Sequence, residues 1–249
     1  MIFARHNLPR YAQVRVSLVL LAAGTAMSAL AQSGPKPLSS PSGTVPATTN
    51  AHFKQVAPGV FQLGEVKLNR NEKTVAFPAV INQQKGPVEY LLVGAQGKIH
   101  ESVLRTAAEP YHIHLGMVLL NAKGTPKGSP VDDYSKPVPG DAIAVSVSWQ
   151  QDGKQRQAAG EDLVFDRQTQ GAMSKGEWTY TGSRVIDGTF LAQRDRSMIA
   201  IIGDIDALVN NPRPRRDQDG NWLVNTKDCP ELGTPVTVTL RLLPPKKAE

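Results

Sequence analysis

Apolar and polar residues alternate with a period of two in two long segments of the chain. In residues 141–149 ("DAIAVSVSW") and 235–243 ("PVTVTLRLL"), every second residue is apolar and those between are mostly small or polar. Because successive side chains of a strand point to opposite faces, this alternation predicts two half-buried β-strands. Shorter apolar runs predict further strands at residues 88–93, 177–181, 188–192 and 197–203. Asp152-Gly153 and Asp187-Gly188 predict hairpin turns, since glycine accepts positive φ.

Helical patterns are scarce. The stronger one starts at Pro110, where the missing N–H of proline costs no hydrogen bond, and runs to a stop at Gly124. A shorter helix is predicted over residues 204–211, with acids in its first turn and Pro212 after its last residue. Together these patterns predict a single α+β domain over residues 56–243, rich in mostly antiparallel strands and with one or two short helices.

The N-terminal residues have the pattern of a secretory signal peptide over residues 1–31. Three arginines precede an apolar run at residues 16–23, and Ala29 and Ala31 fit a signal-peptidase cleavage site. The apolar run is shorter than the roughly 20 residues that a membrane-spanning helix needs. Residues 32–55, rich in Pro, Ser, Gly and Thr, predict a disordered linker, and residues 244–249 a C-terminal tail. We therefore expect an exported protein, periplasmic or extracellular, with no membrane span after cleavage.

Charge and cysteine content exclude two classes of function. The formal net charge of +6 includes three arginines of the predicted signal, which leaves +3 on the rest of the chain. The one dense basic run, "NPRPRR" at residues 211–216, is followed by Asp217 and Asp219, and we interpret it as a solvated loop with no nucleic-acid partner. Cys229 is the only cysteine, so the chain cannot supply the thiolates of an iron–sulfur cluster.

Residues 97–114, "GKIHESVLRTAAEPYHIH", hold three of the five histidines and are the candidate site. Histidine and glutamate bind transition metals and transfer protons near neutral pH. On a helix, His112 and His114 point about 200° apart and cannot bind one ion. The candidate metal ligands are therefore His100 and His114, and the candidate ligand-binding residues are His100, Glu101, Ser102 and His114.

An alternative reading of the same segment is structural. In that hypothesis His100 forms a hydrogen bond with His114 or with a backbone carbonyl across the junction of strand and helix. Glu101 then forms an ion pair with Lys98 or Arg105. Two protein ligands make a poor metal site without a third, so both readings stay open. No G-x-S-x-G motif surrounds Ser102, which makes a serine hydrolase the weakest hypothesis.

Several motifs resemble those of the YdjY-like domain family, exported bacterial proteins of largely unknown function. They are "GPVEYLLV" at residues 86–93, "GKIHES" at 97–102, the histidine-bearing helix before a leucine-rich run, and "WTYTGS" at 178–183. The resemblance covers about residues 56–243. It implies an envelope protein without an established activity. Some members are described as ferredoxin-type proteins, a function that a chain with Cys229 alone cannot have.

The sequence thus favours a non-catalytic binding or accessory module that holds a transition metal or a small polar ligand near His100 and His114. The rival hypothesis is a structural module that binds an envelope protein and no ligand. A metal-dependent hydrolase, or an accessory to a redox system without an iron–sulfur cluster of its own, ranks below both.

Overall fold

The structure is a computed structural model that describes residues 53–129 and 133–245. Residues Thr48–Glu249 form one compact unit, and only this unit is considered below. The predicted signal peptide, nearly all of the predicted linker and most of the predicted tail lie outside the described residues. No helix in the described part of the chain is long and apolar enough to cross a membrane.

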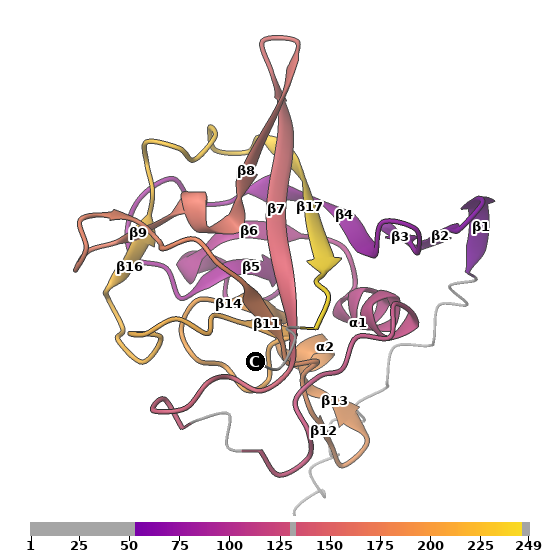
Figure 1. Ribbon diagram of the computed structural model, residues 1–249. Helices are drawn as coiled ribbons and strands as arrows, with labels where there is room; N and C mark the ends of the chain where they lie inside the picture. The colour runs from indigo at the N-terminus through magenta and orange to yellow at the C-terminus, as the bar shows by residue number, and fades with distance from the viewer. Residues whose placement is uncertain (1–52, 130–132, 246–249) are drawn as a thin grey trace, which may run out of the picture. The chain divides into compact units, whose positions relative to one another are not determined.

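Eight strands close into a barrel (Figure 1). In order around the barrel they are β4 (Thr74–Ile81), β17 (Pro235–Leu242), β7 (Asp141–Gln151), β11 (Trp178–Tyr180), β15 (Val209–Asn210), β14 (Ser197–Ala200), β5 (Tyr90–Gly94) and β6 (Ser102–Thr106). The ring closes because β6 also pairs with β4. Six of the eight pairings are antiparallel, while β14–β15 and β5–β6 are parallel.

The closure depends on β4. One edge of β4 pairs with β17 along most of its length. The other edge pairs with β3 (Val66–Asn69) through residues 74–76 and then with β6 through Val80 and Ile81. Pro78 lies between the two pairings and has no N–H to donate to either partner. Its carbonyl instead accepts a hydrogen bond from Thr106 Oγ1 at 2.6 Å.

The barrel interior is filled by the apolar residues of the predicted alternating strands. On β7, Ile143, Val145 and Val147 are buried, as are Val238 and Leu240 on β17. The predictions for these two strands are therefore confirmed. An eight-stranded barrel is just wide enough inside for side chains to fill, which agrees with this packing.

The predicted α+β class is wrong. The chain is β-rich with few helices, as expected, but its main sheet closes on itself instead of forming a layer that helices cover. The helix predicted over residues 204–211 is absent, and those residues form turns followed by β15. There the Asp204 carboxylate accepts a hydrogen bond from the backbone N–H of Asp206 at 2.8 Å, a local contact that competes with helix formation.

The remaining elements extend or cover the barrel. Strands β1 (Lys54–Ala57) and β2 (Val60–Leu63) continue the sheet beyond β3, and β8 (Lys154–Ala159) pairs with β7. A three-stranded sheet contains β10 (Gly171–Ala172), β9 (Val164–Asp166) and β16 (Trp222–Val224). A separate two-stranded hairpin contains β12 (Val185–Ile186) and β13 (Thr189–Phe190). The helices are α1 (Pro110–Leu119), α2 (Leu191–Asp195), and the 3₁₀ turns η1 (Ile99–Glu101) and η2 (Gly160–Leu163).

Both predicted hairpin turns are confirmed. Asp152 and Gly153 link β7 to β8 with φ of 51° and 70°, and Asp187 and Gly188 link β12 to β13 with φ of 49° and 76°. Positive φ at both central residues gives the turn a twist that matches the flanking strands. The Asp-Gly pairs thus set where these two hairpins reverse.

The basic run at residues 211–216 is not a solvated loop, so that interpretation is wrong. Arg213 and Arg216 are buried. Arg213 forms an ion pair with Glu161 at 2.7 Å and lies over the Trp178 ring, 5.2 Å from its centre. The guanidinium of Arg216 donates to the carbonyl of Lys136 at 2.7 Å. Because a guanidinium carries five donors in a fixed plane, these arginines can tie several loops together at once.

Candidate functional site

His100 lies in η1, and 79% of its side chain is exposed. Its Nε2 atom is 3.6 Å from Oε2 of Glu101, its one ion-pair partner among the described residues. Glu101 also forms an ion pair with Lys98 at 3.5 Å, one of the two pairings that the structural reading expected. Exposed pairs of this kind contribute at most about 1 kcal/mol. His100 is therefore available to solvent and is not used to hold the fold.

Two further groups near His100 are more constrained. Burial, followed by the neighbouring Glu101 carboxylate, raises the pKa of Glu89 above its usual range. Ser102 is fully buried, and its hydroxyl donates to the carbonyl of Leu104 at 2.7 Å. Because this hydrogen bond lies within strand β6, Ser102 has a structural role.

His114 lies on α1 in a different environment. It is partly buried, and its Nδ1 atom is 2.8 Å from the Tyr180 hydroxyl. Its ring stacks on Tyr180 and lies 4.8 Å from the ring of Phe190. Burial lowers the pKa of His114 and raises that of Tyr180. The His114 imidazole, in contact with two aromatic rings and hydrogen-bonded to one of them, acts here as a packing and hydrogen-bonding group.

The structure does not bring His100 and His114 together. Both are described, and no hydrogen bond, ion pair or ring contact joins them; η1 precedes β6, and α1 follows it. The expected contact across the strand–helix junction is thus absent. Within residues 53–129 and 133–245, no three His, Cys, Asp or Glu side chains are arranged to hold a metal ion.

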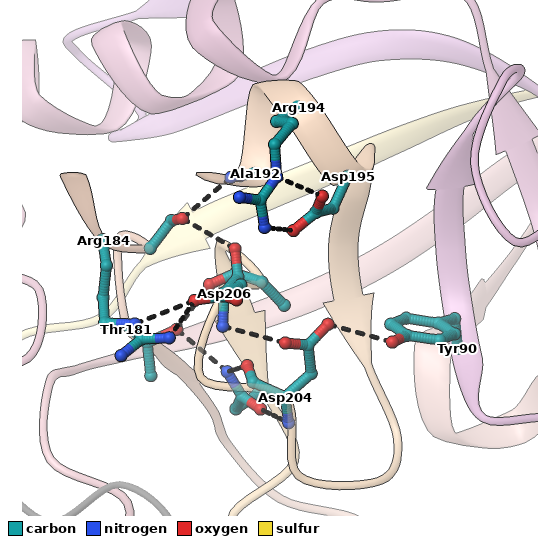
Figure 2. A network of polar contacts seen from close by, with 11 residues as sticks. Tyr90, Thr181, Arg184, Ala192, Arg194, Asp195, Asp204 and Asp206 are labelled. Carbon is teal, nitrogen blue, oxygen red and sulfur yellow. Dashed lines mark hydrogen bonds and ion pairs between the residues drawn. The ribbon is translucent and has the colours of Figure 1, made fainter. Parts of the chain in front are cut away.

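Sequence reasoning missed a polar network at the barrel wall (Figure 2). The Tyr90 hydroxyl donates to Asp204 Oδ2 at 2.9 Å, and burial raises the pKa of Tyr90 to about 12. The amide of Asn210 connects Asp204 to Thr181, donating to the carbonyl of the first and the hydroxyl of the second. The network joins β5, β15 and the end of β11, and its groups are satisfied by one another, as buried polar groups require.

The serine of the "YTGS" motif belongs to the same network. Gly182 and Ser183 both have positive φ, 75° and 62°. This turn directs the Ser183 hydroxyl to the carbonyl of Asp206 at 2.7 Å, while the N–H of Ala192 donates to the same hydroxyl. Ser183 therefore fixes the start of α2 against the 204–208 turn. The motif is explained by this geometry and needs no catalytic role.

An exposed apolar surface lies beside His114, on α1 and the β12–β13 hairpin. Five of the ten large apolar residues that are exposed in the described chain belong to these two elements. They are Tyr111 (50% exposed), Val118 (46%), Leu119 (36%), Val185 (66%) and Ile186 (44%). Together with the partly buried Leu115, we call them the α1–hairpin surface.

Contacts beside this surface connect its two elements, α1 and the hairpin. Phe190 pairs with Val185 across the hairpin, and its ring meets that of Tyr111 edge to face at 6.1 Å. The N–H of Tyr111 donates to Gln193 Oε1, and Gln193 in turn donates to Glu109. Figure 1 shows α1, α2 and the hairpin side by side below the end of β17. The hairpin and α1 therefore form one unit anchored through α2.

Comparison with known families fits the motifs described above. The YdjY domain family model matches residues 66–241, which include the eight strands of the barrel except for the last residue of β17. The chain belongs to this family. No curated protein matches the chain, and no solved structure matches it.

Proposed function

We propose that this YdjY domain protein is an exported, non-catalytic binding module that holds a protein partner on the α1–hairpin surface. The observation that carries the proposal is the composition of α1. Between Pro110 and Leu119 the helix contains no Asp, Glu, Lys or Arg, and its polar side chains are two histidines and a tyrosine.

Helix α1 is apolar on both faces. Ile113, Gly116 and Met117 are buried on the inner face, where Gly116 allows close packing against Val75. Tyr111 and Val118 lie seven positions apart on the opposite, exposed face. A helix that is hydrophobic all round is usually buried on all sides, whereas a surface helix carries polar residues outside. The outer face of α1 thus has the composition of a face that a partner covers.

The exposed residues give such contact a driving force. Burying a large aliphatic or aromatic side chain contributes roughly 1.5–3 kcal/mol relative to leaving it in water. Contiguous exposed apolar patches on soluble proteins commonly mark interaction sites. The candidate His residues favour this reading over the ligand reading, because His114 is already occupied by Tyr180 and His100 lies in another part of the fold.

The exported location rests on the N-terminal sequence. Three arginines, a short apolar run and the Ala29–Ala31 pattern are what a secretory signal peptide requires. N-terminal sequencing of the protein recovered outside the cytoplasm tests this part, and a chain that still begins at Met1 would overturn it.

Site-specific photo-crosslinking in the native cells tests the binding role. A photoreactive phenylalanine analogue replaces Val118 in one variant and Gln155, exposed on β8, in a control. We expect a discrete crosslinked product at Val118, absent at Gln155, and lost when Tyr111→Asp is added. Circular dichroism confirms that each variant is folded. The same products at both positions, or products that survive Tyr111→Asp, would exclude the α1–hairpin surface as the binding site.

A further inference from the structure

We infer that a cavity on the outer wall of the barrel binds a small primary amine with an apolar body. The cavity has a volume of about 570 Å³ and lies between the start of β7, the start of β11 and the chain that follows β17. Cavities that hold small molecules commonly have volumes of roughly 300–1,000 Å³. None of the lining residues belongs to the α1–hairpin surface, so this binding site goes beyond the proposed function.

The walls of the cavity are fixed by contacts within the fold. Arg213, only 8% exposed, lines the cavity and donates from Nε to the carbonyl of Ser174 at 2.6 Å. Its ion-pair partner Glu161 accepts a hydrogen bond from the N–H of Gly176 at 3.2 Å. A wall that is already ordered needs little rearrangement to bind a ligand, which lowers the cost of binding. Prolines, whose φ is fixed, add to this rigidity; those that line the cavity are Pro137, Pro212, Pro244 and Pro245.

Thr179 supplies the cavity with a hydroxyl that the fold does not use. Its neighbours Trp178 and Tyr180 are buried in the core, so the alternation of the strand turns Thr179 to the outer wall. There its methyl group lies close to Gly140, which also lines the cavity. Thr179 is only 6% exposed, yet its hydroxyl has no hydrogen-bond partner within residues 53–129 and 133–245. Hydroxyls of such buried residues usually have a partner, and a bound amine would donate to this one.

The charges that line the cavity favour a cation. Both lining cations are already paired with carboxylates, Lys175 with Asp162 and Arg213 as described above. The Asp141 carboxylate, which also lines the cavity, accepts a hydrogen bond from the backbone N–H of Lys123 at 2.7 Å. It forms no ion pair with a Lys, Arg or His side chain in the described part of the chain. An ammonium group has three donors, so it can pair with this carboxylate and still donate to a hydroxyl.

The remaining lining residues suit an apolar body. Ala142 follows Asp141 on β7 and pairs with Thr179 of β11, so the two polar groups lie on adjacent strands. Besides the four prolines, the apolar side chains around them belong to Val138, Ala142 and Leu243. An amine that carries an aromatic or aliphatic group can thus contact both parts of the lining. A fully polar molecule would leave the apolar part uncovered.

An NMR titration of the exported protein with benzylamine tests the inference. In ¹H–¹⁵N spectra we expect the amide signals of Gly140, Gly176 and Thr179 to shift, because these residues line the cavity. For a probe of so few atoms, we expect a dissociation constant on the order of 1 mM. Benzyl alcohol and benzoate, the neutral and anionic counterparts of the probe, should bind roughly tenfold more weakly or less, because they cannot pair with a carboxylate.

Two variants of nearly unchanged shape isolate the polar groups. Asp141→Asn removes the charge but keeps an oxygen that can accept from the Lys123 N–H, and it should raise the dissociation constant roughly tenfold. Thr179→Val removes the hydroxyl and should raise the constant roughly three- to tenfold. It should not lower the melting temperature, because the hydroxyl has no partner in the described fold. Val118→Asp on the α1–hairpin surface is the control and should leave benzylamine binding unchanged.

Three results would overturn the inference. They are the absence of shifts at benzylamine concentrations about tenfold above the expected dissociation constant, equal affinities for the three probes, and unchanged affinity in both Asp141→Asn and Thr179→Val. Shifts confined to α1 and the β12–β13 hairpin would also overturn it, because the amine would then bind the α1–hairpin surface. Crosslinking at Val118 does not depend on the cavity, so the proposed function can fail or stand independently of these results.

Discussion

Replacing His114 should destabilise the protein, whereas replacing His100 should not, although both belong to one histidine-rich segment. In His114→Ala the buried Tyr180 hydroxyl, in a residue only 1% exposed, loses its hydrogen-bond partner. An unsatisfied buried polar group costs about 1–3 kcal/mol. Loss of the ring contact with Phe190 adds roughly 0.5–1.5 kcal/mol. We therefore expect the free energy of unfolding to fall by about 2–4 kcal/mol. For His100→Ala we expect a change within about 0.5 kcal/mol, since its side chain is mostly in water.

Urea unfolding at pH 7.5, followed by circular dichroism, measures both changes. A double-mutant cycle with Tyr180→Phe isolates the hydrogen bond from the loss of packing, and the two replacements should be non-additive. Equal destabilisation by His100→Ala and His114→Ala would refute the reasoning. The same variants, titrated with zinc, copper and nickel, address the metal hypothesis. A stoichiometric metal that raises the melting temperature and is lost in the double variant would show that the two histidines bind one ion after all.

Two further predictions concern buried charge. Because burial lowers the pKa of His114 below the usual 6.5, the folded state binds fewer protons than the unfolded state near that pH. The free energy of unfolding should therefore fall as the pH drops from about 7.5 through 6.5. His114→Phe should flatten this fall in urea titrations at pH 7.5 and 5.5, and the contribution of His112, whose pKa burial also lowers, should remain. An unchanged slope would contradict the prediction. Glu161→Ala leaves the Arg213 guanidinium buried without its carboxylate and should cost about 3–5 kcal/mol in urea unfolding. Lys175→Ala breaks the exposed ion pair with Asp162 and should lower the free energy of unfolding by about 1 kcal/mol or less. Equal losses in Glu161→Ala and Lys175→Ala would contradict the buried character of the Glu161–Arg213 pair.

The strands were predictable because their patterns are local. The period of two in β7 and β17 indicates which side chains face the core, and an Asp-Gly pair indicates where a chain reverses. Closure of the barrel depends on which strands pair, and no local pattern encodes that the second half of β4 meets β6. An open and a closed sheet require the same alternation along each strand. The period of two therefore predicts the strands, but it does not predict the fold class.

The site was misjudged for a related reason. His100 and His114 are close in sequence, but the true partner of His114 is Tyr180, 66 positions away. Likewise, three arginines next to two aspartates look like a solvated loop, yet Arg213 reaches Glu161, 52 positions away. Sequence proximity of polar residues therefore says little about which of them meet, because a barrel brings together strands that are distant in the chain.

The composition of α1 was visible in the sequence, but its meaning depends on the fold. A ten-residue helix without a formal charge could have been a core helix with both faces buried. The barrel, however, uses its own inward side chains to fill its interior, so it can accept only one face of α1, the face of Ile113 and Met117. The opposite face is then left apolar and exposed, and the hairpin beside it adds Val185 and Ile186. Helix α1 thus carries more apolar side chains than its own fold can bury. This excess favours a protein surface as the binding partner of its outer face.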